Sequence, residues 1–137
     1  MTWLLLLTSL WASPQAVLTV PDSRLPIAVA TQSKNVIGAQ FVNEVREELR
    51  RSTNYRPVDE LGDAKLTVVV TAIDGGCDGA GNGAVVSATI TMPDSGHLPH
   101  YLDTAVAVIS ASQTHEAAVA FVRSLDQVVT NTKKFWP

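Results

Sequence analysis

The sequence predicts an α+β domain, a two-layer sandwich in which two helices cover one face of a mostly antiparallel sheet. Two β-branched, uncharged runs, at residues 66–73 and 84–92, flank a glycine-rich connector and indicate a central hairpin. Two further segments, at residues 36–52 and 114–131, have the apolar period of a helix. With three further strands the predicted order is β-α-β-β-β-β-α, and helices segregated to one face of a hairpin sheet define the α+β class.

Composition is that of one domain. The chain has 137 residues, of which 46% are hydrophobic, so it can bury a core of its own. Its formal net charge is −3, which indicates neither a nucleic acid nor a membrane surface as a partner. We therefore expect a leader at residues 1–16 and a single domain at residues 17–137.

The expected leader has the features of a secretory signal peptide. Residues 1–16 carry no charged side chain, and an apolar run extends from Trp3 to Ala12. This run is shorter than the roughly 20 residues that span a bilayer and has the length of a signal-peptide core. We expect a periplasmic or secreted protein without a stable membrane span in the mature chain. A misplaced start codon and a buried first strand are the alternatives.

Short proline-containing strands are expected around the first helix. Residues 25–31 form a predicted strand with Pro26 near its start, and residues 55–59 form another that contains Pro57. Proline cannot donate to a strand ladder, so both are expected near a strand start or at a sheet edge. We therefore expect guarded edges, which disfavour strand addition there.

The first helix is predicted over residues 36–52, with Ser33 or Asn35 as its cap. Its other face mixes arginine and glutamate, which indicates a solvated surface rather than a basic patch. The apolar stripe that predicts the helix recurs every four residues: Ile37, Phe41, Val45 and Leu49.

A strand at residues 101–109 and a helix at residues 114–131, capped by Ser112, complete the predicted domain. They follow a loop at residues 93–100. Six apolar residues form the stripe of this second helix: Ala118, Phe121, Val122, Leu125, Val128 and Val129.

The two faces of the central hairpin differ. Alternate residues of a strand point to opposite faces. One face is wholly apolar, with Leu66, Val68 and Val70 in its first strand, and is expected on the core. The other face is expected toward water and carries five hydroxyl side chains: Thr67, Thr71, Ser87, Thr89 and Thr91.

Residues 26–74 resemble the periplasmic modules of the TolB N-terminal type, a group that includes curli-assembly and penicillin-binding-protein-activator lipoproteins. The matching order is an Ile-Ala-Val strand at residues 27–29, a helix ending in Glu-Leu-Arg-Arg-Ser at 48–52, an aromatic-led strand at 55–59 and Leu-Gly-Asp-Ala at 61–64. The resemblance covers about a third of the chain. It implies a binding module of the bacterial envelope with no active site to carry over. The chain departs from the group in lacking a lipid-anchor cysteine and in its glycine-rich connector.

The connector, residues 74–83, has the composition of a structural loop. Gly79, Gly81 and Gly83 lack the spacing of a phosphate-binding loop, and a strand rather than a helix follows them. Asp74, Asp78 and Asn82 are oxygen donors, but their spacing is not that of a calcium-binding EF-hand loop, and such residues suit turns.

Cys77 lies in the same connector and is the only cysteine of the chain, so no internal disulfide can form. A free thiol is the expectation. An intermolecular disulfide, a metal ligand or a nucleophile with a histidine brought close by folding are the alternatives.

His97 and His100, with Asp94 and Asp103 nearby, are the cluster that most resembles a metal site. The His-x-x-His spacing lies in a proline-containing loop, which does not place both imidazoles on one side. A solvated loop is therefore expected there.

The sequence thus predicts an exported, non-catalytic binding module that contacts another cell-envelope protein. Its expected binding surface is the hydroxyl face with one of two loops, either the glycine-rich connector or the loop that carries His97 and His100. The alternative is a small metal-binding protein or enzyme that uses Cys77 and that histidine loop. No sequence feature indicates a cofactor, a nucleic-acid partner or a particular oligomeric state.

Overall fold

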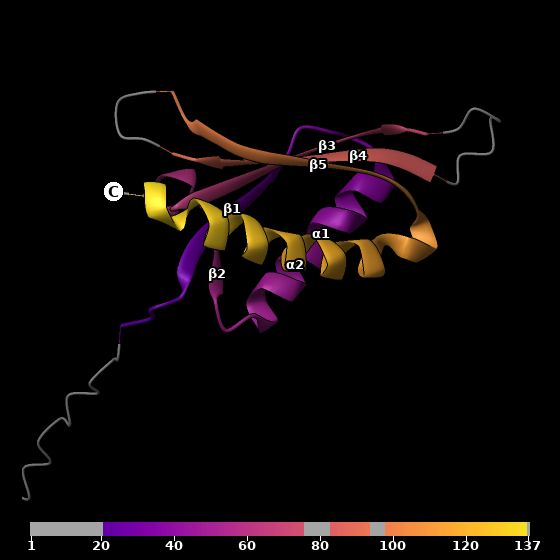
Figure 1. Cartoon of the computed structure of the whole chain (residues 1–137). Coiled ribbons are helices and arrows are strands. Elements are labelled where there is room, and N and C mark those ends of the chain that lie inside the picture. Colours follow the sequence, from indigo (N-terminus) through magenta and orange to yellow (C-terminus); the bar gives the residue numbers. More distant parts are fainter. Residues whose placement is uncertain (1–20, 76–82, 94–97, 137) are drawn as a thin grey trace, which may run out of the picture.

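Strands and helices follow one another in the predicted order, β-α-β-β-β-β-α. The computed structural model describes residues 21–75, 83–93 and 98–136, so the expected leader lies outside the described residues. Among the described residues, five strands form one sheet in the order β2-β1-β3-β4-β5 (Figure 1). The elements are β1 (Leu25–Thr31), α1 (Val36–Arg51), β2 (Tyr55–Val58), β3 (Leu66–Asp74), β4 (Gly83–Met92), β5 (His100–Ser110) and α2 (Thr114–Thr132), with short 3-10 turns η1 (Leu61–Asp63), η2 (Ala111–Gln113) and η3 (Lys133–Phe135).

The α+β class is confirmed, and the sheet is mixed. Strands β3, β4 and β5 pair antiparallel, as the hairpin pattern predicts. Strand β1 pairs parallel with both β2 and β3, so the expectation of a mostly antiparallel sheet holds for the β3–β4–β5 part only. The crossover through α1 brings β2 beside β1 in the same direction, and the connection through η1 then brings β3 to the other side of β1, again in the same direction.

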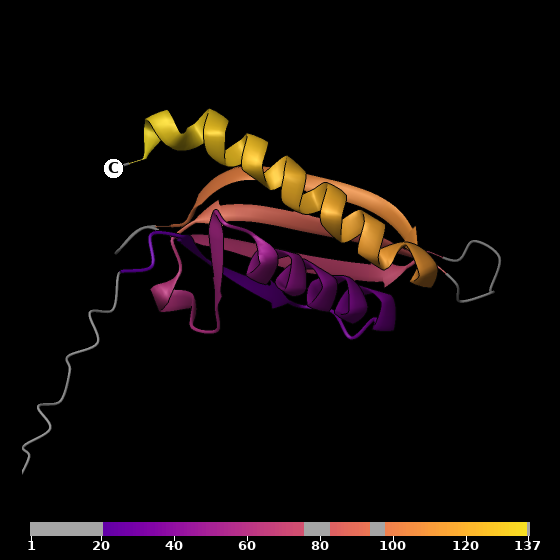
Figure 2. The same cartoon turned by 90° about the horizontal axis from the view of Figure 1, so that it is seen from below.

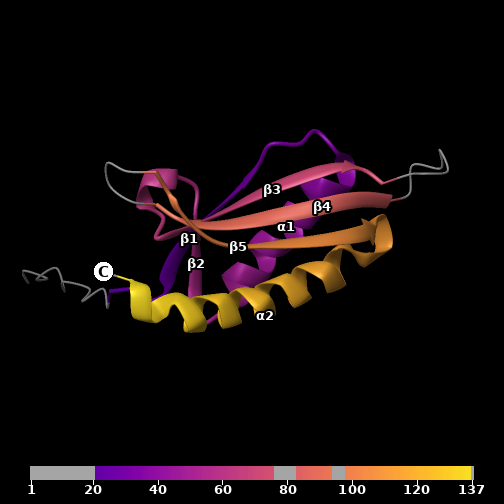
Figure 3. The same cartoon turned by 45° about the horizontal axis from the view of Figure 1, so that its top comes forward.

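Both helices lie against the same face of the sheet, as the views from below and at an angle show (Figure 2 and Figure 3). The two helices also pack on each other, and the rings of Phe41 and Phe121 meet edge to face with their centroids 6.1 Å apart. The hairpin residues predicted to face the core, including Leu66, Val68 and Val70, are buried. Among the described residues, no helix is long and apolar enough to cross a membrane.

Helix α1 is capped by Asn35, one of the two predicted caps. The Asn35 side chain accepts a hydrogen bond from the Gly38 N–H at 2.9 Å, which satisfies a donor that the first turn leaves free. On the solvent side Arg51 pairs with Glu48 at 2.8 Å. Arg46 turns back to donate a 2.7 Å hydrogen bond to the carbonyl of Val29, beyond the residues that β2 pairs. One arginine of the predicted solvated face, Arg46, therefore connects α1 to β1 by a hydrogen bond.

Helix α2 begins differently from the prediction, which placed the cap at Ser112. A single 3-10 turn, η2, precedes α2, and Ser110 and Gln113 form a capping box around that turn. The Ser110 N–H donates to Gln113 Oε1 at 3.1 Å. The predicted cap was wrong because a helical turn already starts at Ala111, three residues before the predicted start of the helix at residue 114.

The sheet edges also differ from the prediction. Pro57 lies in β2, which is an edge strand as expected, but Pro26 lies in β1, between β2 and β3. Pro26 is tolerated there as the second residue of its strand, where its carbonyl accepts a 2.8 Å hydrogen bond from the Lys65 N–H. The second edge of the described sheet is β5, which has no proline between His100 and Ser110.

Strand β5 contains a bulge near its start. Its register with β4 shifts between Ile90 and Thr91, so that Thr91 pairs with Tyr101 and Ile90 with Asp103. Leu102 is the extra residue and packs against the core. Strict alternation would have placed Leu102 on the side of Val106 and Val108, and the bulge reverses this.

Candidate functional site

The face of the sheet opposite the helices is uncovered in the described structure (Figure 1). Cross-strand neighbours share a face, so the register defines four rows across β3, β4 and β5. Each of the predicted hydroxyl residues lies on this face. The rows are Ile73–Val85–Val108, Thr71–Ser87–Val106, Val69–Thr89–Thr104 and Thr67–Thr91–Tyr101.

Part of the hydroxyl chemistry of this face is used within the sheet. The Thr89 and Thr104 hydroxyls are 3.2 Å apart and share a hydrogen bond, while the Thr91 hydroxyl donates to the Thr67 carbonyl at 3.5 Å. Thr71 is exposed and Ser87 is half-buried. The hydroxyls most available to a partner therefore lie in the second row, at Thr71 and Ser87.

The uncovered face also carries large apolar side chains that the sequence reasoning did not name as site residues. Ile73, Tyr101, Val106 and Val108 are 61%, 62%, 66% and 71% exposed. The alternation of β3 already placed Ile73 on this side. The side of the sheet on which Val106 and Val108 lie follows from the pairing of β5 with β4, and the sequence pattern alone did not predict that pairing.

The histidine loop does not join this face as predicted. His97 lies outside the described residues. His100 pairs with Met92. Met92 is on the same side of β4 as the buried Ala88 and Ile90, which face the helices, so His100 lies on the opposite side of the sheet from the hydroxyl rows. The described structure thus brings together the five hydroxyl residues but not His100.

The predicted metal and thiol chemistry falls largely outside the described chain. Cys77, Asp78, Asn82 and Asp94 belong to residues whose structure is not described. Among the residues that are described, no group of three or more potential metal-ligating side chains occurs. His115 instead links the two helices, because its Nδ1 lies 2.9 Å from Glu44 Oε2.

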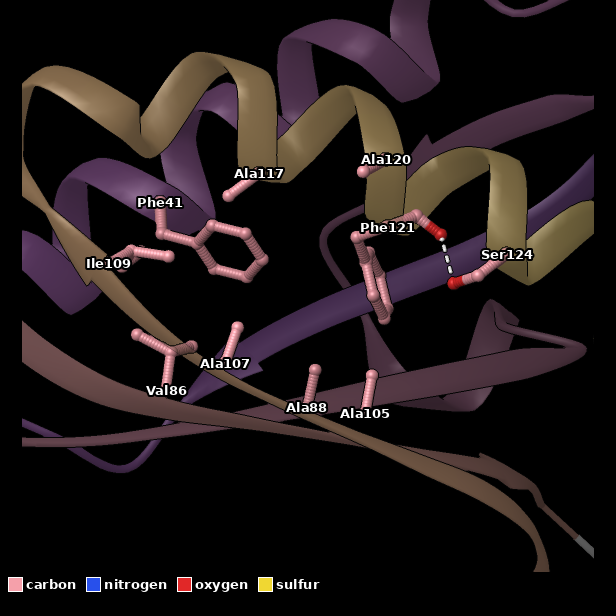
Figure 4. A pocket seen from close by; sticks show the side chains of 10 residues that line it. All are labelled: Phe41, Val86, Ala88, Ala105, Ala107, Ile109, Ala117, Ala120, Phe121 and Ser124. Carbon is pink, nitrogen blue, oxygen red and sulfur yellow. Dashed lines mark hydrogen bonds between the residues drawn. The ribbon is translucent and has the colours of Figure 1, made fainter.

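An apolar groove of about 240 Å³ opens between β5 and α2 (Figure 4). Small side chains form it: Ala105 and Ala107 of β5 lie opposite Ala117 and Ala120 of α2, with Phe121 at its base. The one polar side chain of its lining, Ser124, donates its hydroxyl to the Phe121 carbonyl at 2.7 Å. The groove therefore offers shape and apolar surface, but no group for acid–base or nucleophilic chemistry.

A polar cleft lies at the opposite end of α2, where Tyr55, Asp126 and Lys133 line a hollow together with Trp136. Burial raises the pKa of the Tyr55 phenol, and its hydrogen bond to Asp126 raises that pKa further. Tyr55 therefore stays protonated at neutral pH, and its phenol lies in the cleft beside the Asp126 carboxylate.

No protein-family model matches the chain. No curated protein matches its sequence either.

Proposed function

We propose that this chain is an exported, non-catalytic binding module that contacts another protein of the cell envelope through the uncovered face of its sheet. One observation carries the proposal: Ile73, Tyr101, Val106 and Val108 are each more than 60% exposed on one face. Apolar side chains gathered on a surface next to polar groups mark a protein-contact site more often than a solvated surface.

The chemistry of the face suits a protein partner. The apolar row at Ile73, Val85 and Val108 adjoins the hydroxyl row at Thr71 and Ser87, so apolar contact and hydrogen bonding are offered side by side. Side chains on paired strands are already restricted in rotamer, so ordering them on binding costs little entropy. Export remains a proposal supported by the leader-like residues 1–16, and the envelope partner by the resemblance of residues 26–74 to TolB-type modules.

Co-purification from the native host tests this proposal. Thr71→Lys and Ser87→Lys place two charges at the centre of the face, on strands β3 and β4 that are not sheet edges. The domain should fold as before, and an envelope protein that co-purifies with the parent chain should be lost. Leu61→Lys, at an exposed position of η1, is the matched control and should retain the partner. Full recovery of the partner with the Thr71 and Ser87 variant would refute the assigned surface.

A further inference from the structure

Strand β5 is the sheet edge without a proline, and side chains occupy the backbone N–H groups at both ends of its segment 104–110. The Thr104 N–H donates to its neighbour Asp103 at 2.8 Å, and the Ser110 N–H donates to Gln113 at 3.1 Å. Both amides therefore point away from β4. Since successive amides of a strand alternate in direction, the N–H groups of Val106 and Val108 also point outward.

The pairing with β4 agrees with this assignment. The side chains of directly opposed residues approach most closely at the pairs that do not exchange backbone hydrogen bonds. The Thr89 and Thr104 hydroxyls are 3.2 Å apart, so Thr104 belongs to such a pair and its backbone is directed to the edge. Between the two capped amides, the outward donors of β5 are thus those of Val106 and Val108, on either side of Ala107.

We propose that two copies of this chain form a homodimer by pairing their β5 strands antiparallel about a two-fold axis at Ala107. This register places Val106 of one copy opposite Val108 of the other. Each such pair exchanges two backbone hydrogen bonds, so the two pairs use the free donors and leave the capped amides of Thr104 and Ser110 undisturbed. A two-fold axis makes the surface self-complementary, and the sheets of the two copies become continuous.

The helix side of the edge has room for this pairing. Ala107 is exposed, and with Ala117 and Ala120 of α2 it lines the apolar groove beside β5 (Figure 4). The C-terminal part of α2 runs out past β5 when the molecule is seen from the helix side (Figure 2). Alanine at the crossing lets the two α2 helices approach within the usual 8–10 Å of packed helices.

Charge complementarity selects a second copy as the occupant. Residues 104–110 of β5 carry no ionisable side chain, so like charges do not oppose each other at the axis. On α2, Glu116 and Arg123 flank Ala120, are both exposed and have no ion-pair partner among the described residues. Antiparallel α2 helices that cross between Ala117 and Ala120 bring Glu116 of each copy within a helical turn of Arg123 of the other.

The apolar surface adds to the same interface. Val106 and Val108 stand on the uncovered face beside the edge, and pairing would gather four valines around the axis. A stable interface needs on the order of 1,000 Å² of buried surface. The two-fold axis repeats each contact, so the strands, valines and α2 helices each contribute to that area twice. Val106 and Val108 belong to the surfaces of both proposals, whereas Thr71 and Ser87 lie on β3 and β4 and are not part of the dimer interface. Loss of the partner in the Thr71 and Ser87 variant and loss of the dimer in the Val106 variant can therefore be told apart.

Sedimentation velocity of the purified full-length protein across the micromolar range tests the dimer. The wild-type protein should sediment as a dimer. Val106→Pro removes one outward N–H without touching the bonds to β4 and should yield a monomer, whereas Leu61→Lys at η1 should remain dimeric. A wild-type chain that stays monomeric throughout would overturn the proposal.

A charge exchange on α2 gives a second test that does not depend on how the proline variant folds. Glu116→Arg or Arg123→Glu alone places like charges together and should weaken the dimer about tenfold or more. The double variant E116R/R123E restores opposite charges and should recover most of the wild-type affinity. A dimer that neither single change weakens, or a double variant as weak as the singles, would overturn the α2 crossing and the axis at Ala107.

Discussion

Gly38 of α1 lies so close to Ala72 of β3 that a Cβ on the glycine would overlap the Cβ of Ala72. Glycine inside a helix costs about 0.5–1 kcal/mol relative to alanine. Its presence in α1 is explained by this close approach, which sets the distance between the helix and the sheet. The size of the side chains at residues 38 and 72 therefore determines how closely α1 packs on the sheet.

We predict that Gly38→Ala destabilises the domain by about 1–3 kcal/mol, the usual cost of overpacking, although alanine is the better helix former. Urea unfolding followed by circular dichroism measures the change. Gly62→Ala is the control, because nothing lies within 4 Å of a Cβ at Gly62. If Ala72→Gly is combined with Gly38→Ala, the loss should be smaller than the sum of the single changes. A Gly38→Ala protein more stable than the parent would contradict the contact.

Phe41 joins the two helices to the sheet. Its side chain is 4% exposed and packs edge to face on Phe121. We predict that Phe41→Ala lowers the free energy of unfolding by about 3–5 kcal/mol, because it removes a buried aromatic ring and leaves a cavity. Val36→Ala, at an exposed position of the same helix, should leave the urea midpoint nearly unchanged. Equal midpoints for both variants would mean that α1 does not cover the core.

The raised pKa of Tyr55 predicts how the stability of the fold changes at alkaline pH. Its pKa is raised in the folded protein, by burial first and by the hydrogen bond to Asp126 second. The folded state thus favours the neutral phenol, and the resulting stabilisation is present below the ordinary tyrosine pKa of about 10 and is lost as pH rises through the higher folded pKa. Tyr55→Phe should make stability fall less steeply above pH about 10. Tyr101→Phe, at an exposed tyrosine, should leave the slope unchanged, and an unchanged slope for Tyr55→Phe would contradict the assignment.

Local periodicity predicted much of this fold. The apolar stripe of Ile37, Phe41, Val45 and Leu49 predicted α1 to within one residue of its observed end. The alternation of the hairpin predicted which of its faces is buried, and burial confirms it at Leu66, Val68 and Val70. These predictions are correct because each depends only on the side chains of a single segment.

The order of strands in the sheet depends on contacts between distant segments, and there the predictions fail. Pro26 indicated a strand start or an edge. Its place near the strand start is confirmed, but the guarded edge inferred from it is wrong, because β2 is added outside β1 after the α1 crossover. Leu102 broke the alternation of β5 through a bulge. The candidate site follows the same division: the hydroxyls of β3 and β4 were predicted together, while the exposure of Val106 and Val108 required the place of β5 at the edge.

Removal of the leader is a prediction of the sequence alone. An apolar run at residues 3–12, followed by Pro14 and Ala16, has the length and order of a signal peptide. Intact mass spectrometry of the protein from its native host should find a chain that lacks the first sixteen residues or close to that number. A protein that still begins at Met1 would contradict both export and the proposed envelope location.

Thr71 and Ala72 are neighbours in β3 that point to opposite faces, and their substitution by lysine separates the uncovered face from the core. Thr71 is exposed, so Thr71→Lys should change the free energy of unfolding by no more than about 0.5 kcal/mol. Ala72 is 5% exposed and packs beneath α1, so Ala72→Lys should cost at least about 3 kcal/mol, because an unpaired charge would be buried. Urea midpoints of the two variants measure the difference. Similar losses for both would mean that something covers the proposed binding face, and the Thr71 surface would then be unavailable to a partner.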